Sequence, residues 1–274
     1  MEDLEVRYGS RRAVGGLSLE LHPGTITALV GGDGAGKTSV LRALAGTITP
    51  ELGTMHRPPA HEIGYMSAGP GIYFDLSVHE NLWFAGRAYG VSAPALQERS
   101  AMLLERTGLS SVHAWLVAHL SGGMRQKLAL AVTLIHEPRL VLLDEPTTGV
   151  DPVSRAELWR LIARVAANGA AVLLATSYVE EAERAGHLVV LADGMPLLSG
   201  ASAELVASVP GALYSSVSRP RAAFRWRRGR LWRAWSPDGR ALPDAARIEP
   251  DLEDAVVIAE LARGAGRDEE AIAA

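Results

Sequence analysis

Short apolar runs alternate with amphipathic segments along most of the chain. Four runs composed mostly of β-branched residues, leucine and alanine have the length of buried strands, at residues 25–30, 140–143, 171–175 and 188–191. Between the first two runs, residues 37–45 carry apolar side chains at helical spacing. Alternation of strands and helices predicts an α/β fold with a mainly parallel sheet.

Further elements are expected around this pattern. Residues 4–22 have the pattern of antiparallel strands, and a Pro23-Gly24 turn separates them from the first buried strand. Three successive helices are expected between strands, which predicts an inserted helical subdomain at about residues 75–137. A short strand at 62–66 precedes these helices, which are expected at residues 78–89, 94–107 and 121–136.

Asp151 as N-cap and Pro152 in the first turn begin one more helix, which is expected to end near residue 168.

The composition changes towards the C-terminal end of the chain. From about residue 209 the chain becomes rich in arginine, tryptophan and proline. We therefore expect a main domain at residues 1–208 and a small β-containing accessory region at residues 209–274.

Composition excludes several classes of site. The chain has 274 residues, 48% of them hydrophobic, which is enough for a large core. It has no cysteine, which excludes disulfides, thiolate metal sites and a cysteine nucleophile. A formal net charge of −4 does not indicate nucleic acid as a partner. We find no apolar run long enough to span a membrane and no signal peptide.

A glycine-rich segment with the pattern G-x-x-x-x-G-K-[ST] lies between the first buried strand and the first helix. Glycines let the backbone N–H groups of such a loop point at phosphate oxygens, and the helix N-terminus adds partial positive charge. Lys37 is expected to reach the β- and γ-phosphates, and Thr38 to offer its hydroxyl to Mg²⁺. An ordinary glycine-rich turn would not require the complete pattern. The predicted nucleotide site comprises Gly31, Gly32, Asp33, Gly34, Ala35, Gly36, Lys37, Thr38 and Ser39.

The apolar run at residues 140–143 ends in two adjacent carboxylates. Phosphoryl transfer needs a bound metal ion and a positioned water. We expect Asp144 to hold the Mg²⁺ shell and Glu145 to act as the base or to orient the attacking water. An acidic pair at a strand end can also be a surface feature, but its position after a phosphate loop favours a catalytic function.

Residues 120–124, with the sequence Leu-Ser-Gly-Gly-Met, form a second candidate anion site. Ser121 is expected to cap a helix whose free N–H groups and dipole face an anion. A Ser-Gly-Gly helix start is also a common capping device, so the segment alone leaves both interpretations open. Its position shortly before the strand that ends in Asp144 favours the anion site.

Together these segments resemble the ATP-binding subunit of an ABC transporter. The resemblance covers roughly residues 4–205. Its specificity comes from the signature-type sequence at residues 120–128 in combination with a phosphate loop. The segments at 144–152 and 251–255 resemble the drug- and polyketide-exporting ABC-2 branch, in which the permeases are separate six-helix proteins.

The resemblance implies a P-loop ATPase fold with an antiparallel β subdomain and a helical subdomain, and it implies ATP and Mg²⁺ as ligands. Tyr8 matches the aromatic residue that stacks on adenine, although a lone tyrosine near a terminus can be an ordinary strand residue. Two such domains sandwich two ATP molecules head to tail. Asp151 would lie at the dimer seam, and the partner's nucleotide would be covered by Ser121, Gly122, Gly123 and Met124.

The same resemblance implies partners and a location. Closing and reopening of the ATP sandwich would drive an integral-membrane permease. The chain would therefore be cytoplasmic, peripheral on the inner face of the cell membrane, and paired with a second ATP-binding chain that is identical or non-identical.

The sequence departs from the family at two positions. Similar chains carry a glutamine after the strand at 62–66 and a histidine after the strand at 171–176, where this chain has Ala68 and Ser177. A rearranged loop at residues 69–71 is one alternative for Ala68, and a capping box formed by Ser177 with Glu180 is the alternative for Ser177. Otherwise the site lacks two contacts to the γ-phosphate, which predicts slow hydrolysis and pairing with a complete ATP-binding chain.

Residues 219–233 contain seven arginines together with three aromatic residues. A hairpin turning at residues 228–229, with tryptophan on one face and solvated arginine on the other, is the favoured interpretation. The acidic residues at 249–254 would offset its charge. Binding of anionic lipid or nucleic acid are the alternatives.

Two other functions remain open for the whole chain. One is a non-transport ABC ATPase that acts on ribosomes or nucleic acid, and the other is a regulatory nucleotide-binding module. The single phosphate loop and the lack of cysteine favour the exporter subunit, for which no nucleic acid partner is expected.

Overall fold

The computed structural model describes residues 1–69 and 71–273, with side chains to residue 264, and the chain divides into two compact units. The first unit comprises Met1–Gly186 and Leu191–Pro196, and the second comprises His187–Val190 and Leu197–Ala274. The boundary between residues 208 and 209 that composition suggests stays a prediction.

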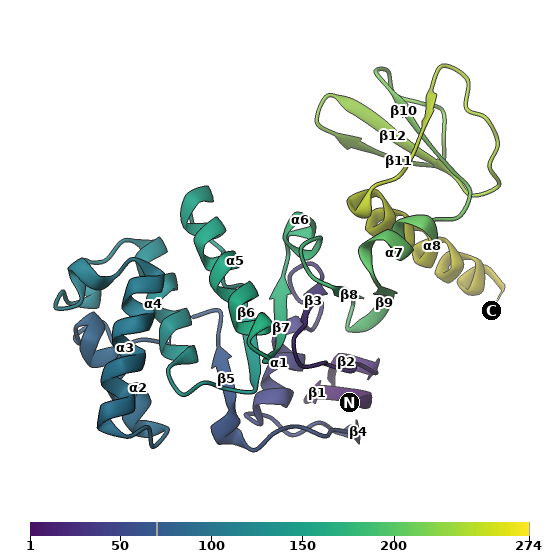
Figure 1. Cartoon of the computed structure of the whole chain (residues 1–274). Helices are drawn as coiled ribbons and strands as arrows, with labels where there is room; N and C mark the ends of the chain where they lie inside the picture. The colour runs from purple at the N-terminus through teal and green to yellow at the C-terminus, as the bar shows by residue number, and fades with distance from the viewer. Residues whose placement is uncertain (70, 274) are drawn as a thin grey trace. The chain divides into compact units, whose positions relative to one another are not determined.

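A parallel sheet forms the centre of the first unit (Figure 1). Its strands are short and almost completely buried, as their apolar sequences predict. The pairing of β6 with β7 runs from Leu140 opposite Ala171 to Asp144 opposite Ala175. The strands lie in the order β5 (Ile63–Met66), β6 (Leu140–Asp144), β7 (Ala171–Thr176) and β3 (Ile26–Val30), followed in the same sheet by β8 (His187–Ala192) and β9 (Met195–Gly200). The predicted α/β class is confirmed.

A small antiparallel sheet precedes and flanks this centre. It has the strand order β2-β1-β4, with β1 at Glu2–Tyr8, β2 at Arg11–Leu17 and β4 at Leu52–Thr54. The first two strands confirm the prediction for residues 4–22. Strand β4 was not predicted, because its three residues are all exposed and show no apolar alternation. Helix α1 (Lys37–Ala45) contacts β5, β6 and β7 of the parallel sheet.

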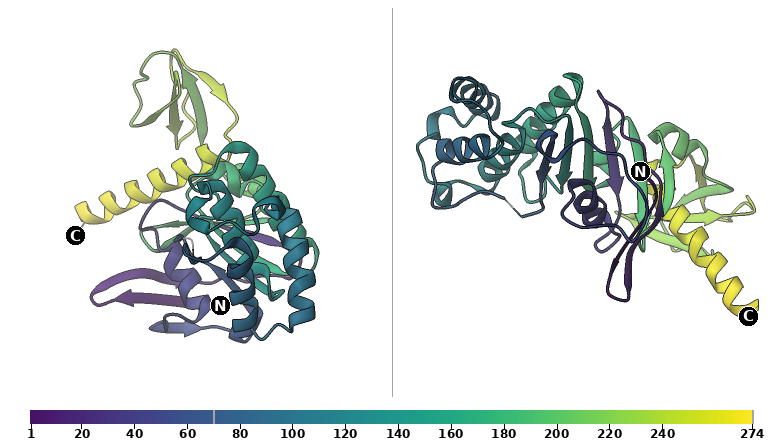
Figure 2. Two further views of the ribbon diagram at one scale, coloured as in Figure 1. Left: turned by 90° about the vertical axis from the view of Figure 1, so that its left-hand side faces the viewer. Right: turned by 90° about the horizontal axis from the view of Figure 1, so that it is seen from below.

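Three helices gather on one side of the first unit (Figures 1 and 2). Ser77 and Glu80 form the expected capping box at the start of the first of them. Leu82, Leu96 and Leu128, one from each helix, are fully buried in a shared apolar cluster. The helices are α2 (Val78–Ala88), α3 (Ala93–Thr107) and α4 (Gly122–Leu134), with short 3₁₀ turns at Ala60–Glu62, Ser110–Val112 and Val117–His119.

Two further helices follow strands of the parallel sheet. Helix α5 (Pro152–Ala167) begins at Asp151, whose side chain accepts hydrogen bonds from the N–H groups of Val153 and Ser154 at 3.0 Å. This confirms the predicted N-cap. The short helix α6 (Val179–Ala182) follows β7.

The second unit contains a four-stranded antiparallel sheet and two helices. Leu213 and Trp235 from the sheet and Ile258 from the last helix form its buried centre. The sheet order is β11 (Phe224–Arg228), β12 (Leu231–Ser236), β10 (Ala212–Ser216) and β13 (Ala246–Ile248), and the helices are α7 (Ser202–Ala207) and α8 (Leu252–Ala273). The predicted hairpin is present, and its turn lies at Gly229-Arg230.

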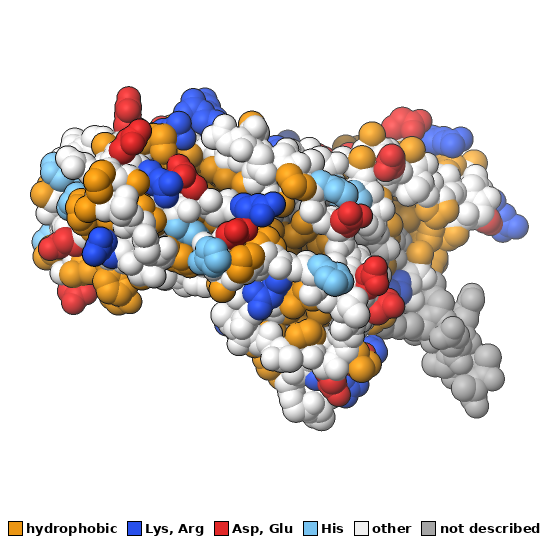
Figure 3. Space-filling view, turned by 60° about the horizontal axis from the view of Figure 1, so that its bottom comes forward, with side chains coloured by type: hydrophobic (Ala, Val, Ile, Leu, Met, Phe, Trp, Pro, Cys, Tyr) orange, Lys and Arg blue, Asp and Glu red, His pale blue; other side chains and the backbone are white. Residues whose placement is uncertain are grey.

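The described helices include none that is long and apolar enough to cross a membrane. On the face shown in Figure 3, acidic and basic side chains are interspersed, and hydrophobic side chains form small separate areas.

Candidate functional site

The glycine-rich loop follows the carboxyl end of β3 and leads directly into α1. A Cβ atom at Gly31 would lie 2.4 Å from the carbonyl oxygen of Leu191, and one at Gly36 would lie 2.4 Å from that of Ala13. Gly36 also has a φ of +104°, which side chains rarely tolerate. Both positions therefore require glycine, and the close approach of neighbouring backbone fixes the shape of the loop.

A cavity of about 460 Å³ lies over this loop. Tyr8 and Arg11 line it from the antiparallel sheet, and Ala68, Asp144 and Glu145 line it from the ends of the parallel strands. The structure thus brings most of the predicted site residues to one place. Ligands bind at the carboxyl ends of parallel strands in open α/β sheets, and this cavity lies there.

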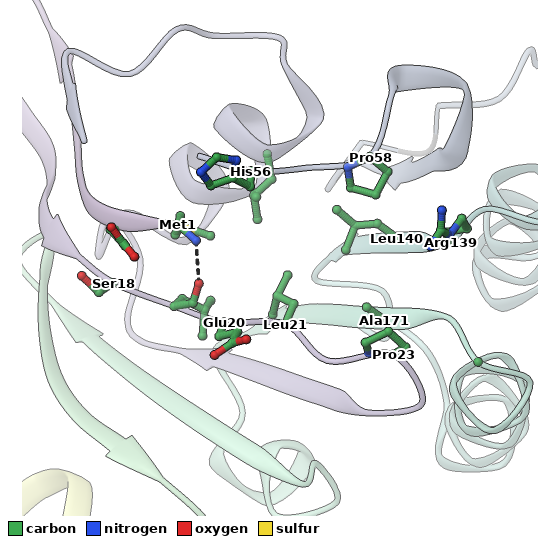
Figure 4. Close-up of a pocket in the computed structure, with 14 residues that line it drawn as sticks. Met1, Ser18, Glu20, Leu21, Pro23, His56, Pro58, Arg139, Leu140 and Ala171 are labelled. Atoms are coloured by element: carbon green, nitrogen blue, oxygen red, sulfur yellow. Dashed lines mark hydrogen bonds between the residues drawn. The ribbon is translucent and has the colours of Figure 1, made fainter. Parts of the chain in front are cut away.

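A second cavity, of about 790 Å³, lies at the opposite ends of the strands (Figure 4). Leu140 and Ala171, the first residues of β6 and β7, are part of its lining. It has no phosphate loop, and the one hydrogen bond drawn there joins the amino group of Met1 to the carbonyl oxygen of Leu19 at 2.8 Å. The smaller cavity is therefore the candidate nucleotide site.

Lys37 is the positive charge inside the loop, with only 6% of its surface exposed. Its ammonium group donates hydrogen bonds to the carbonyl oxygens of Gly31 at 2.6 Å and Gly32 at 3.2 Å. It also donates to Ser177 Oγ at 3.0 Å, and its Nζ lies 3.4 Å from Glu145 Oε1. The amine is therefore held at the loop by backbone oxygens and faces a carboxylate.

Asp144 is the last residue of β6 and is 1% exposed. Both of its carboxylate oxygens lack a hydrogen-bond partner among the described residues. Burial raises the pKa of Asp144, and the charge of Glu145 acts in the same direction, whereas Thr38 and Lys37 act in the opposite one. A carboxylate with free oxygens beside a hydroxyl is a donor set that suits Mg²⁺, so these residues fit the metal that the phosphate loop implies.

The described residues contain no group of three or more side chains that would hold a metal ion on their own. Mg²⁺ typically keeps several waters and binds through one or two carboxylates and substrate phosphates. Asp144 and Thr38 therefore match the small protein contribution expected at such a site.

Replacement of Asp144 by Asn should increase the free energy of unfolding at neutral pH when Mg²⁺ and ATP are absent. The pKa of the Asp144 carboxyl is higher in the folded state than in the unfolded state, so this group stabilises the fold when the pH is below its pKa in the unfolded state. The stabilisation is lost as the pH rises through its pKa in the folded state. Thermal unfolding of both proteins from acidic to neutral pH should show the wild type losing stability relative to Asp144→Asn. Equal or lower stability of the variant at neutral pH would contradict the claim that burial of the charged Asp144 carboxylate destabilises the fold. As a control, Mg-ATP should stabilise the variant less than the wild type.

Glu145 has a φ of +52°, an uncommon conformation for a residue other than glycine. Its backbone N–H donates to the carbonyl oxygen of Ala175 at 2.9 Å, which holds this conformation. Its carboxylate accepts hydrogen bonds from Ser177 Oγ at 2.7 Å and from Thr148 Oγ1 at 3.0 Å. The backbone thus directs the carboxylate towards the cavity beside Lys37.

Ser177 does not cap the helix that follows it. Helix α6 has Tyr178 as its N-cap and no side-chain capping bond, so the predicted Ser177-Glu180 capping box is wrong. The hydroxyl of Ser177 instead bridges Lys37 and Glu145. The Lys37 ammonium and the Glu145 carboxylate form stronger hydrogen bonds with the hydroxyl than the neutral backbone N–H groups of a helix start would.

Ala68 lies in the lining of the cavity, where it contributes only a methyl group. Tyr8 is 45% exposed at the same cavity, and its hydroxyl lies 3.5 Å from Ser39 Oγ. Stacking of Tyr8 on adenine stays a prediction.

The signature segment forms a separate group that does not line this cavity. Ser121 caps α4 and accepts a hydrogen bond from the N–H of Met124 at 3.2 Å, as predicted. A Cβ atom at Gly123 would lie 3.4 Å from a carboxylate oxygen of Asp151. Backbone hydrogen bonds at the start of α5 lower the pKa of Asp151. The two predicted interface elements are therefore adjacent within one chain.

A buried carboxylate behind the site was not identified from the sequence. Glu181 is 4% exposed and accepts hydrogen bonds from Thr147 and Thr176, and its Oε1 lies 3.5 Å from Arg155 Nε. It links the segment after Glu145 to the segment after β7. Arg11, on the cavity wall, was also missed. Neither residue belongs to a motif that would mark it.

Comparisons with known proteins agree with the geometry. The family model described as ABC transporter matches residues 14–148. The chain is 39% identical over 223 residues to the probable multidrug ABC transporter ATP-binding protein YbhF of Escherichia coli, and this match covers 77% of the chain but only 39% of YbhF. The match to Nod factor export ATP-binding protein I of Paraburkholderia xenovorans is 37% identical and covers 74% of the chain and 71% of that protein.

Two further similarities complete the comparison. Daunorubicin resistance ATP-binding protein DrrA3 of Streptomyces coeruleorubidus is 34% identical, over 77% of the chain and 70% of that protein. A solved structure of an ATP-binding subunit of an ABC transporter superposes with a TM-score of 0.69 at 28% identity, over 74% of the chain and 90% of that structure.

Proposed function

Because the chain belongs to the ABC transporter family of ATP-binding proteins, we propose that it is the ATP-binding, energy-coupling subunit of an exporter. The observation that carries this proposal is the convergence of the phosphate loop, Asp144 and Glu145 on one cavity. The names of its relatives, which include multidrug, Nod factor and daunorubicin proteins, support export.

The loop amides and Lys37 would bind the triphosphate of ATP. When ATP enters, its β- and γ-phosphate oxygens would replace Glu145 and Ser177 as partners of the Lys37 ammonium. Mg²⁺, held by Thr38 and Asp144, would neutralise phosphate charge. Glu145, released from Lys37, would accept a proton from the attacking water or orient that water.

Hydrolysis at this site would be slow. Ala68 offers no hydrogen-bonding group, and Ser177 carries only a short hydroxyl side chain where similar chains carry a histidine. Loss of one preorganised polar contact to a reacting group commonly lowers the rate about 100-fold or more. The site would therefore hold ATP for most of the cycle.

A second ATP-binding chain would cover the far end of the nucleotide. Ser121 and Gly122 are exposed at the start of α4, where they are free to contact a nucleotide bound by a partner. Asp151, beside them, would lie at the dimer seam. A partner with the glutamine and histidine that this chain lacks would form the faster site, completed by Ser121, Gly122, Gly123 and Met124 of this chain.

An exposed aromatic pair, one member of which follows Ala68 closely in sequence, supports docking of a permease. The rings of Tyr73 and Phe84 contact each other edge to face, with centroids 4.9 Å apart, and both are about half exposed. Trp115 and Leu116 are also exposed on the same helical subdomain. Large apolar side chains that are exposed in contact with each other, as Tyr73 and Phe84 are, indicate a protein interface. We place the chain in the cytoplasm, bound to a permease at the inner face of the cell membrane.

Purification of the chain from its native cells, through an affinity tag and mild detergent, tests this proposal. We expect an integral-membrane permease to copurify, with a second ATP-binding chain that carries the missing glutamine and histidine. Recovery of a homodimer of the chain together with the permease would contradict the mixed dimer only. Copurification with ribosomal subunits or nucleic acid, without a membrane protein, would contradict the transporter function.

A further inference from the structure

The four-stranded sheet of the second unit has two faces with different arginines. Residues directly opposite each other in antiparallel strands share a face, so the register assigns each side chain. One row contains Phe224, Trp235, Leu213 and Ile248, and its members pack with Ile258 and Leu261 of α8. The other face carries the row Arg225, Ala234, Tyr214 and Arg247.

Arginines on the α8 face are neutralised. Arg228 forms ion pairs with Asp251 and with Glu253, the latter at 2.7 Å, and Arg233 lies 3.5 Å from Asp254. The acidic segment at the start of α8 therefore offsets this part of the basic cluster, as predicted. The prediction that the tryptophans share one face is wrong, because Trp226 pairs with Arg233 and Trp232 pairs with Arg227, which places the two rings on opposite faces.

Arginines on the other face have no acidic partner. We define the basic face as Arg219, Arg225, Arg227 and Arg247, and within the described part of the chain none of them forms an ion pair. Arg219, Arg227 and Arg247 are exposed. The guanidinium of Arg219 lies 5.7 Å from the centroid of the Trp232 ring. Tyr214 and Ala234, in the central strands of this face, are buried, so the exposed arginines lie at its edges. Three exposed arginines without an acidic partner give this face a positive charge that attracts anions.

We propose that the basic face binds the headgroups of anionic phospholipids. Base stacking, which single-stranded nucleic acid binding uses, needs an open aromatic ring, whereas the half-buried Trp232 is covered by Arg219. The proposal rests on the proposed function only in that a permease partner would bring the chain to a membrane.

Binding to vesicles tests this proposal on the full chain. The purified protein should sediment with vesicles that contain phosphatidylglycerol and not with vesicles of phosphatidylcholine alone, and high salt should release it. The variant with Arg219→Gln, Arg227→Gln and Arg247→Gln should bind roughly 100-fold more weakly, about fivefold for each arginine. A control with Arg106→Gln, Arg160→Gln and Arg164→Gln removes the same charge from exposed helix positions and should bind like the wild type.

Three outcomes would overturn the assignment: equal binding to both vesicle types, undiminished binding by the basic-face variant, or equal loss in the control. A single-stranded oligonucleotide that displaces the protein from vesicles at lower concentrations than added competitor vesicles of phosphatidylglycerol would assign the face to nucleic acid instead. Unfolding temperature and Mg-ATP binding of both variants should match the wild type. Loss of vesicle binding with ATP binding intact separates this test from a failure of the proposed ATP site.

Discussion

Replacement of Lys37 by Ala should weaken binding of Mg-ATP to the isolated chain by on the order of 100-fold. The lysine is the cation buried inside the loop, and it donates hydrogen bonds to the backbone carbonyls of Gly31 and Gly32 at the start of the loop. The substitution removes the positive charge that would offset the negative charge of the β- and γ-phosphates. In the partly buried nucleotide cavity, electrostatic interactions are stronger than in water. Isothermal titration with Mg-ATP measures the change.

Lys127, the chain's one other lysine, provides the matched control. It forms an ion pair with Glu157 and does not line the nucleotide cavity. Lys127→Ala removes the same charge and should leave ATP affinity unchanged. Wild-type affinity in Lys37→Ala, or an equal loss in both variants, would contradict the assignment of the loop.

Restoring the two missing polar groups should accelerate hydrolysis. The double variant Ala68→Gln and Ser177→His should raise kcat on the order of 100-fold, because each side chain adds a contact at the developing charge on the γ-phosphate. Each single variant should give a smaller increase. Steady-state hydrolysis, measured over a range of protein concentrations to include self-association, tests this.

Glu145 controls the interpretation of that experiment. Addition of Glu145→Gln to the double variant should abolish the gain, because the carboxylate that accepts hydrogen bonds from Ser177 and Thr148 is the proposed base. A folded double variant that binds ATP without faster hydrolysis would show that Ala68 and Ser177 are not the cause of slow turnover. A gain that survives Glu145→Gln would place the base elsewhere.

Local patterns predicted the elements around the phosphate loop well. The buried strands at β3, β6 and β7 have uninterrupted apolar sequences, and the caps at Ser77 and Asp151 depend on residues within one helical turn. Such features are fixed by neighbours in sequence, so the sequence reveals them. The placement of Asp144 and Glu145 at the end of β6 followed from the same reasoning.

Features that depend on distant partners were missed or wrong. Ser177 has a local capping option with Glu180, but Lys37, 140 residues away, and Glu145 offer charged partners. Glu181 resembles any acidic residue at a helix start, yet it is buried by contacts with Thr147 and Arg155. The face of each tryptophan in the second unit depends on strand register, which the turn at Gly229-Arg230 determines.

The rate of a single turnover of ATP on the isolated chain tests the central claim most directly. The claim is that this chain captures nucleotide at Lys37 but cleaves it slowly, since Ala68 and Ser177 stand where γ-phosphate contacts are needed. We predict saturable ATP binding followed by hydrolysis much slower than nucleotide dissociation. Rapid cleavage that Glu145→Gln abolishes would contradict the claim.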